Sequence, residues 1–194
     1  MHSYATDVDR SKVTLVLGAG SVGIAYLLYW AIHAAGVASP WWIDIPGPLG
    51  IAAVMFAIYD RAGWRWRFGP LRLSTIPDLS GTWEGSVRSD YDDGENVQTG
   101  ILRISQHWTS IRVRYEPAAD SSSSTSVVAA VLTAEDDPTL VYEYINEPGP
   151  FAAPAMTPHR GLARLQVKQD GRLAGDYYTG RLRKTAGAMD FHRR

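Results

Sequence analysis

The sequence contains no cysteine, which excludes a disulfide scaffold and any thiolate site and is compatible with a cytoplasmic domain. None of its five histidines forms a pair with the spacing of a zinc site, and no serine lies in a nucleophile-elbow motif. The formal net charge of −1 gives no support for a general DNA or RNA binder. We therefore expect a protein that is not an enzyme and that has no catalytic residues, no bound metal and no cofactor.

Charge is also missing from a long stretch near the N-terminus. Residues 13–43 contain no Asp, Glu, Lys or Arg, and a second apolar run covers residues 45–59. Because about 20 apolar residues suffice for a helix to cross a bilayer, the two runs predict a hairpin of two transmembrane helices over residues 13–60. A buried hairpin of a soluble protein is the alternative, although so long an uncharged run has no polar face for water.

Basic residues flank this hairpin on both sides. They are Arg10, Lys12, Arg61, Arg65, Arg67 and Arg72, whereas the link between the two runs carries only Asp44. By the positive-inside rule both ends of the hairpin face the cytoplasm. We expect residues 1–12 to be a frayed cytoplasmic segment and residues 61–76 to be a basic, aromatic juxtamembrane linker, with Trp64 and Trp66 at the membrane interface.

The first apolar run also contains the glycine-rich sequence GAGSVG, at residues 18–23. A G-x-G-x-x-G motif with an acid about twenty residues later, here Asp44, is typical of NAD-binding folds, so an NAD-binding protein is an alternative. The further βα repeats that such a fold needs are not evident downstream. In a membrane hairpin, Gly18, Ala19, Gly23 and Ala25 would instead form small faces that let helices approach closely.

From residue 77 onward the hydrophobic pattern alternates with a period of two. Eight short strands are predicted, at residues 82–89, 97–106, 110–116, 126–134, 139–146, 161–169, 173–180 and 187–193. No helical segment interrupts them, and the serine-rich stretch 120–126 is expected to be a flexible loop. Residues 77–194 therefore predict a small eight-stranded antiparallel, lipocalin-like barrel, with a β-sandwich as the alternative.

Two of the predicted strands carry aromatic and polar side chains along one face. These rows are Tyr142, Tyr144 and Asn146 within residues 140–146, and Tyr177, Thr179 and Arg181 within residues 175–181. Aromatic rings stack on bases, a guanidinium binds phosphate, and amides read base edges, so the rows suit a nucleotide-sized anion. Ordinary barrel packing would also account for them, with Trp83 plugging the floor of the barrel. A membrane-anchored, lipocalin-like carrier would instead have a lining of Leu, Val and Phe.

Four short motifs occur in order along the second part of the chain: PDLSGTWEG at 77–85, YEYINEP at 142–148, HRGLA at 159–163 and GDYYTGRLRKTAG at 175–187. With the hairpin in front of them, the sequence resembles the two-transmembrane β-barrel effectors of bacterial cyclic-oligonucleotide-based antiphage signalling systems (CBASS). The resemblance implies a barrel that senses a cyclic dinucleotide made by a partner nucleotidyltransferase. It also implies homo-oligomerisation and disruption of the inner membrane, a multi-pass location with both termini cytoplasmic, and abortive infection.

The resemblance further implies a set of ligand-binding residues. In this sequence they are Tyr144, Asn146, His159, Arg160, Tyr177, Thr179 and Arg181. Gly180 and Leu182 stand where the family pattern has polar residues, and this difference leaves the base preference open.

Overall fold

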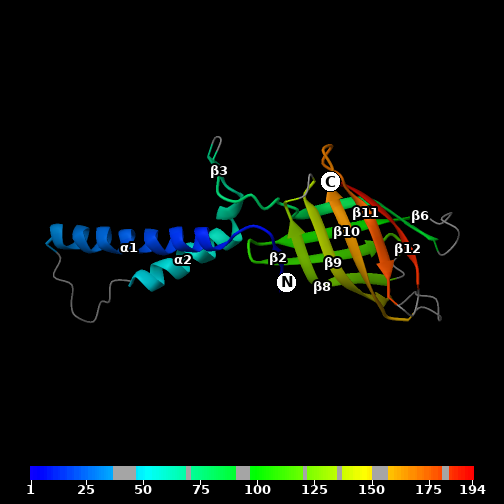
Figure 1. Ribbon diagram of the computed structural model, residues 1–194. Coiled ribbons are helices and arrows are strands. Elements are labelled where there is room, and N and C mark those ends of the chain that lie inside the picture. Colours follow the sequence, from blue (N-terminus) through cyan, green and yellow to red (C-terminus); the bar gives the residue numbers. More distant parts are fainter. Residues whose placement is uncertain are drawn as a thin grey trace. The chain divides into compact units, whose positions relative to one another are not determined.

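The chain folds into two compact units, which we describe separately. The computed structural model describes residues 1–36, 47–68, 71–90, 97–119, 122–134, 137–149, 157–180 and 184–194. One unit combines Met1–Val8 with Thr75–Arg194, and the other is Asp9–Ser74. The first unit is a barrel and the second is helical (Figure 1).

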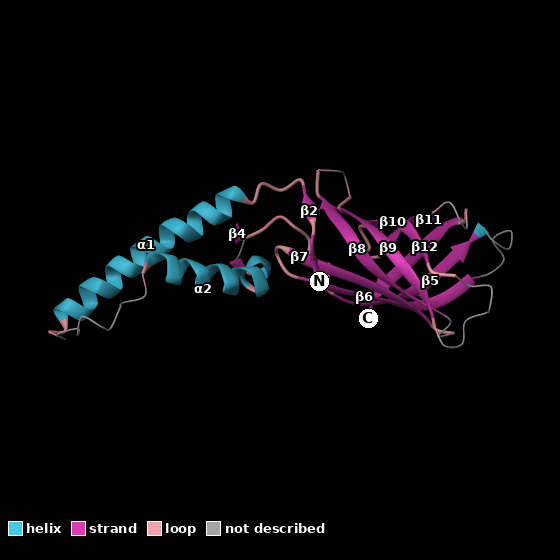
Figure 2. Ribbon diagram, turned by 90° about the horizontal axis from the view of Figure 1, so that it is seen from below, coloured by secondary structure: helices cyan, strands magenta, loops and turns pink. Residues whose placement is uncertain are grey.

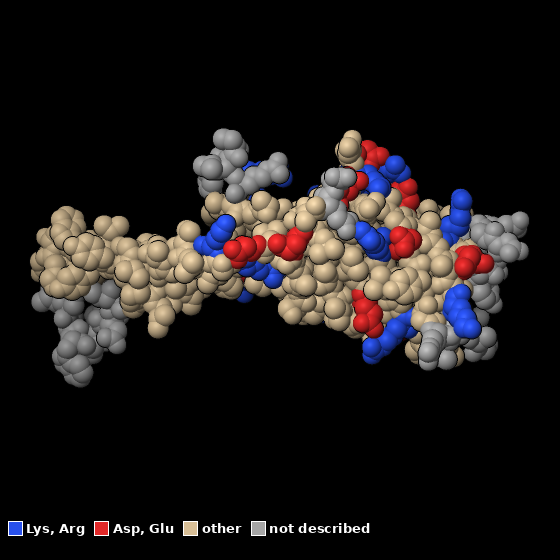
Figure 3. Space-filling model, in the orientation of Figure 1, with Lys and Arg blue, Asp and Glu red and all other residues tan. Residues whose placement is uncertain are grey.

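Helix α1 (Ser11–Ala34) is the longest element of the helical unit. The carboxylate of Asp9 accepts a hydrogen bond of 2.9 Å from the N–H of Ser11, which satisfies a backbone donor at the start of the helix. Its 24 residues span about 36 Å, which exceeds the roughly 30 Å hydrocarbon core of a bilayer. Figure 3 shows no Lys, Arg, Asp or Glu over most of the face of α1 that it draws. By length and composition, α1 can therefore cross a membrane.

Helix α2 (Pro48–Arg61) is much shorter. Its 14 residues extend about 21 Å, so this helix alone does not span a bilayer and the second transmembrane helix is not confirmed. Proline stands at its first turn, where the missing N–H costs no hydrogen bond. The unit ends with a 3₁₀ turn, η1 (Gly63–Arg65), and the hairpin β3 (Arg67–Phe68) and β4 (Leu71–Arg72).

The glycine-rich motif lies entirely within α1. An NAD-binding motif needs a strand, a tight turn and then a helix, so the alternative of an NAD-binding protein is wrong. A Cβ atom added at Gly18 or Gly23 would meet no described atom within 4 Å. Gly20, in contrast, would contact Met55 of α2 at 3.3 Å. Gly18 and Gly23 therefore leave an open face on the helix.

Eight antiparallel strands form a closed barrel (Figures 1 and 2). They are β5 (Gly81–Ser89), β6 (Val97–Gln106), β7 (Ser110–Pro117), β8 (Ser122–Leu132), β9 (Thr139–Pro148), β10 (His159–Val167), β11 (Leu173–Thr179) and β12 (Ala186–Arg193). Each strand pairs with the next in sequence, and β12 returns to pair with β5. This closure confirms the predicted barrel and excludes the β-sandwich.

The serine-rich stretch is the main error in the predicted strands. We expected residues 120–126 to form a loop, but β8 begins at Ser122, and Ser122 to Ser126 pair with the end of β9. Ser124 and Ser126 are buried while Ser123 and Thr125 are partly exposed, which is the alternation of a strand. A bulge between Ser126 and Val128 then shifts the register. Composition suggested a loop because serine-rich tracts are typical of flexible linkers.

One end of the barrel, which we call the floor, is packed with apolar side chains. Trp83 and Leu79 are 3% and 2% exposed, and the indole N–H of Trp83 donates to the carbonyl of Leu79 over 2.9 Å. The amide of Gln106 accepts from the N–H of Leu79 at 2.8 Å and donates to the carbonyl of Pro77 at 3.1 Å. Trp83 therefore plugs the floor, as the sequence suggested.

The N-terminal residues belong to the barrel, so the expectation that they are frayed is wrong. Strand β1 (His2–Ser3) pairs with β7, and β2 (Ala5–Thr6) runs parallel to β8. The Asp7 carboxylate accepts hydrogen bonds from Thr133 and from the N–H of Ala134. Desolvation raises the pKa of Asp7, but these hydrogen bonds outweigh it and hold the pKa below its ordinary value.

Candidate functional site

The end of the barrel opposite the floor is lined by polar and aromatic side chains, and we call this end the polar mouth. Its inward-pointing residues on five neighbouring strands are Tyr115, Ser124, Ser126, Tyr142, Tyr144, Asn146, His159, Tyr177 and Thr179. On β7, β9, β10 and β11 these residues continue the alternation of the buried floor residues, and on β8 the bulge between Ser126 and Val128 moves the inward positions to Ser124 and Ser126. Five of the seven predicted site residues, Tyr144, Asn146, His159, Tyr177 and Thr179, are therefore brought together here.

Asn146 and His159 lie directly opposite each other on β9 and β10. The Nδ1 atom of His159 is 3.1 Å from the carbonyl of Thr157, which can only accept, so Nδ1 carries the proton. Nε2 then accepts a hydrogen bond from the side-chain amide N–H of Asn146, over 3.4 Å. This pair presents donors and acceptors side by side at the rim of the mouth.

Three tyrosine rings of the mouth rest against inward-facing glycines. Gly161 is the cross-strand partner of Tyr144, and a Cβ atom added there would collide with the Tyr144 hydroxyl. A Cβ atom at Gly187 would lie 2.6 Å from the ring of Tyr177, and one at Gly100 would lie 2.7 Å from the ring of Tyr115. Each glycine leaves the space that the ring occupies against the barrel wall. The glycines therefore set the positions of the aromatic rings.

The tyrosines differ in how deeply they are buried. Burial, followed by the proximity of Tyr177, raises the pKa of Tyr115 to about 12. Burial, followed by the neighbouring Tyr144 and Tyr115, raises the pKa of Tyr142 well above its ordinary value. The Tyr115 hydroxyl is buried and has no hydrogen-bond partner among the described residues. Such a group is a ready donor for a polar ligand atom.

Thr179 has a structural task at the rim. Its hydroxyl accepts from the N–H of Thr185 at 2.9 Å and lies 2.9 Å from the Thr185 hydroxyl. Because these bonds join the end of β11 to the residue before β12, Thr179 holds together the base of the loop between these strands. Arg181 belongs to this loop and lies outside the described residues.

Arg160 is not brought together with the other predicted residues. It follows His159 on β10 and points to the outer face, where its guanidinium lies 3.3 Å from the Glu143 carboxylate and its side chain is 67% exposed. The contribution of Arg160 to ligand binding stays a prediction, as do the contacts of the other six residues.

Sequence reasoning missed three residues of the mouth. Tyr115 alternates with Ile111 and Val113, a pattern that an ordinary core residue also shows, and this alternation places it inside the barrel. Its position on the strand could have identified Tyr115 as a mouth residue. It lies four residues after Ile111, near the end of β7 that is on the same side of the barrel as Tyr177. Ser124 and Ser126 were missed because their stretch was taken for a loop.

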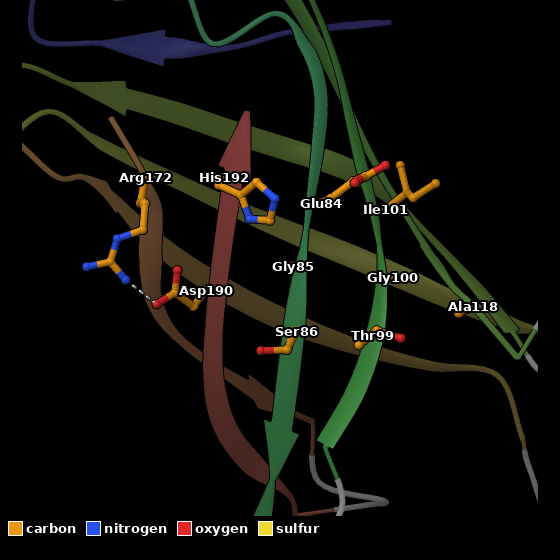
Figure 4. A pocket seen from close by; sticks show the side chains of 10 residues that line it. All are labelled: Glu84, Gly85, Ser86, Thr99, Gly100, Ile101, Ala118, Arg172, Asp190 and His192. Carbon is orange, nitrogen blue, oxygen red and sulfur yellow. Dashed lines mark hydrogen bonds and ion pairs between the residues drawn. The ribbon is translucent and has the colours of Figure 1, made fainter. Parts of the chain in front are cut away.

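A separate hollow of about 660 Å³ lies on the outer face of β12, β5 and β6 (Figure 4). Its charged walls include Glu84, Asp190 and Arg172, and Arg172 pairs with Asp190 at 2.6 Å. The side chains of Ser86 and Thr99 lie next to each other there. Because these residues alternate with the buried ones on their strands, the hollow is not part of the polar mouth.

Residues 74–193 match the family model of the Cap15, cyclic dinucleotide receptor domain. The chain belongs to this family. The match covers more than half of the sequence and all eight barrel strands, so the resemblance to these CBASS effectors is confirmed. No curated protein matches the chain. The Cap15 match begins at residue 74, so the N-terminal strands β1 and β2 lie outside it.

Proposed function

We propose that this Cap15-family chain is an antiphage effector whose barrel binds a cyclic dinucleotide at the polar mouth. The observation that carries the proposal is the family match together with the row of Tyr144, Asn146 and Tyr177 inside one end of the barrel. The mouth does not resemble the apolar lining that a lipocalin-like carrier would need. The cyclic dinucleotide is the product of a partner nucleotidyltransferase.

The chemistry of the mouth fits the parts of such a ligand. Rings held against the wall, such as Tyr144 and Tyr177, offer flat faces on which bases stack. The Asn146 and His159 pair supplies an amide and an imidazole that can read a base edge. The buried Tyr115 hydroxyl gains a partner when a polar ligand atom reaches it, which removes the cost of an unpaired group.

The phosphates require positive charge from elsewhere. No Arg or Lys on the described strands points inward at the mouth end, because Arg88, Arg114 and Arg160 all face outward. We assign phosphate binding to Arg181, in the loop whose base Thr179 holds together. A guanidinium forms two parallel hydrogen bonds with a phosphate, which suits this role.

The test uses neighbouring residues that point to opposite faces of one strand. The full chain in detergent is titrated with a panel of cyclic dinucleotides, and Tyr177→Ala is compared with Tyr178→Ala. Tyr177 points into the mouth, whereas Tyr178 is 51% exposed outside. Losing one stacking platform costs about 1–3 kcal/mol, so Tyr177→Ala should weaken binding about 5- to 150-fold and Tyr178→Ala should leave it unchanged.

A second pair, His159→Ala and Arg160→Ala, decides the role of the outward arginine. Weaker binding by His159→Ala alone supports the mouth, and weaker binding by Arg160→Ala shows that the ligand also reaches the outer face. If no cyclic dinucleotide binds the full chain, or if Tyr178→Ala is as damaging as Tyr177→Ala, the proposed site is rejected.

The output we propose is ligand-driven homo-oligomerisation and disruption of the bacterial inner membrane by the helical hairpin. This proposal is supported by α1, a helix of 24 residues that carries no charged side chain after Lys12 and can cross a membrane by length and composition. Both chain ends lie in the cytoplasm in this arrangement, which needs a second crossing longer than the 14 residues of α2. Liposomes that contain the full chain should release a trapped dye only when the ligand is added. Release without ligand, or none with a bound ligand, contradicts this output.

A further inference from the structure

The barrel has one weak junction, between β7 and β8. Only two residue pairs join these strands, Arg114 with Thr125 and Tyr115 with Ser124. The neighbouring junctions, β6 with β7 and β8 with β9, are paired along most of their length. Toward the floor, β7 and β8 separate, and β1 and β2 pair with their edges instead. Met1–Val8, which we call the seam segment, therefore completes the wall of the barrel.

Specific side-chain contacts hold the seam segment in place. The Ser126 hydroxyl accepts from the N–H of Val113 at 2.9 Å and lies 2.8 Å from Nε2 of His2, so it links β7, β8 and the segment. Tyr4 is 4% exposed. At the other end, the Asp7 carboxylate binds two successive backbone N–H groups after β8. A frayed terminus would not show this set of contacts.

The seam segment adjoins the polar mouth. Tyr115 and Ser124, which form one of the two junction pairs, point into the mouth, and Ser126 is the next inward residue on β8. A ligand that binds the Tyr115 hydroxyl thus contacts β7 at its junction with β8. Docking or release of the seam segment acts on the same junction. The site and the seam share these side chains.

The seam segment also adjoins α1, because only Asp9 and Arg10 lie between Val8 and the first residue of the helix. The three Cα–Cα steps from Val8 to Ser11 reach at most about 11 Å. While the segment is docked, the helical unit is attached to the barrel at both of its ends, here and at Thr75. Undocking breaks the pairing of the segment with β7 and β8, and the helical unit then stays joined to the barrel through residue 75.

We propose that the seam segment is a releasable strand that couples the polar mouth to the transmembrane helix: it restrains α1 when docked, and ligand binding favours its release. The proposal rests on the proposed function. A ligand shifts this equilibrium only if it binds the undocked state more tightly. Coupling is reciprocal, so a segment that is held in the seam must weaken ligand binding, by about fivefold or more for typical couplings.

The experiment locks the segment in place with an engineered disulfide. Ser3 and Ser110 are antiparallel partners, so their Cα atoms are close enough for a Ser3→Cys/Ser110→Cys pair to bond. The chain has no other cysteine, so no competing thiol exists. The matched control is Ser86→Cys/Thr99→Cys, partners at the fully paired junction of β5 and β6. Both variants are studied as full chains in liposomes, oxidised and reduced.

Oxidation of the seam pair should weaken cyclic dinucleotide binding at least about fivefold and abolish dye release, and a reductant should restore both. Oxidation of the control pair should change neither. Equal binding and equal dye release by the oxidised and reduced seam pair overturn the proposal, while the proposed function stands. If the wild-type chain binds ligand but never releases dye, the proposed output fails, and the oxidation-dependent affinity alone decides the coupling.

A second pair of variants works in the opposite direction. Asp7→Ala removes the carboxylate that anchors the seam segment to the residues after β8, so it should tighten ligand binding and cause some dye release without ligand. Asp9→Ala removes only a hydrogen-bond acceptor at the start of α1, so it should leave ligand affinity unchanged. Weaker or unchanged ligand binding by Asp7→Ala counts against the coupling.

Discussion

Replacing Gly161 by alanine tests whether the glycines of the barrel wall position the tyrosines of the mouth. A Cβ atom at this position would collide with the Tyr144 hydroxyl and would lie 2.6 Å from the backbone carbonyl of Tyr178. The ring can rotate away, but the carbonyl belongs to the neighbouring strand and cannot. Overpacking of this kind costs about 1–3 kcal/mol, and we expect the upper end of that range because backbone is involved. The melting temperature should fall by about 10 °C.

The assay is thermal unfolding of the full chain in detergent, with ligand titration alongside it. Gly180→Ala is the control, since a Cβ atom at that exposed glycine would approach only the carbonyl of Arg160, at 3.3 Å. Tyr144→Ala should cost less in the Gly161→Ala background than in the wild-type chain, because removing the ring there also removes its collision with the new Cβ atom. If Gly161→Ala melts within about 1 °C of the wild type, or if the two changes are additive, the glycine does not position the ring.

Three further predictions concern the floor, the tyrosines and the helix. Gln106→Leu leaves the N–H of Leu79 unpaired and should lower the free energy of unfolding by about 2 kcal/mol, whereas Ser105→Leu on the outer face should not, as measured by urea unfolding. The pKa of Tyr115 is raised to about 12, so its contribution to stability is complete below pH 10 and lost as the pH rises toward 12. Unfolding at pH 9 and 11 should therefore differ by about 1 kcal/mol, and Tyr115→Phe should reduce the difference. Gly23→Leu fills an open helix face, so ligand binding should persist while dye release falls; unchanged release would argue against helix contact there.

The barrel was predictable because its strands obey a simple pattern. Strand β6 begins and ends at the predicted residues, and β5, β7, β11 and β12 differ by a single residue at one end. Alternation also placed Tyr144, Asn146 and Tyr177 on the inner face, since a period of two fixes the side of every residue once the register is known. Local sequence therefore carried most of the barrel and most of the mouth.

The errors occurred where pairing depends on residues far away in the sequence. Nothing local marks His2 and Ser3 as a strand, because the residues with which they pair, Ile111 and Ser110, are about a hundred residues away on β7. The serines of β8 look like a loop until the facing strand β9 supplies their hydrogen bonds. Strand β10 also begins two residues before the predicted start, and Arg160 faces outward on it, while its contact with ligand stays a prediction. These features depend on tertiary contacts that a sequence window does not contain.

The position of the seam segment in the sequence determines how late in synthesis the barrel can be completed. The segment leaves the ribosome before its partner strand β7, which follows about a hundred residues later. At ordinary rates of synthesis this delay is roughly 5–20 s. During that interval α1 and α2 have already emerged, and the barrel that would hold their N-terminal end does not yet exist. Each new copy therefore passes through a period in which α1 and α2 have been made but the barrel strands that pair with the seam segment have not. Slow or stalled synthesis beyond residue 75 would lengthen that period.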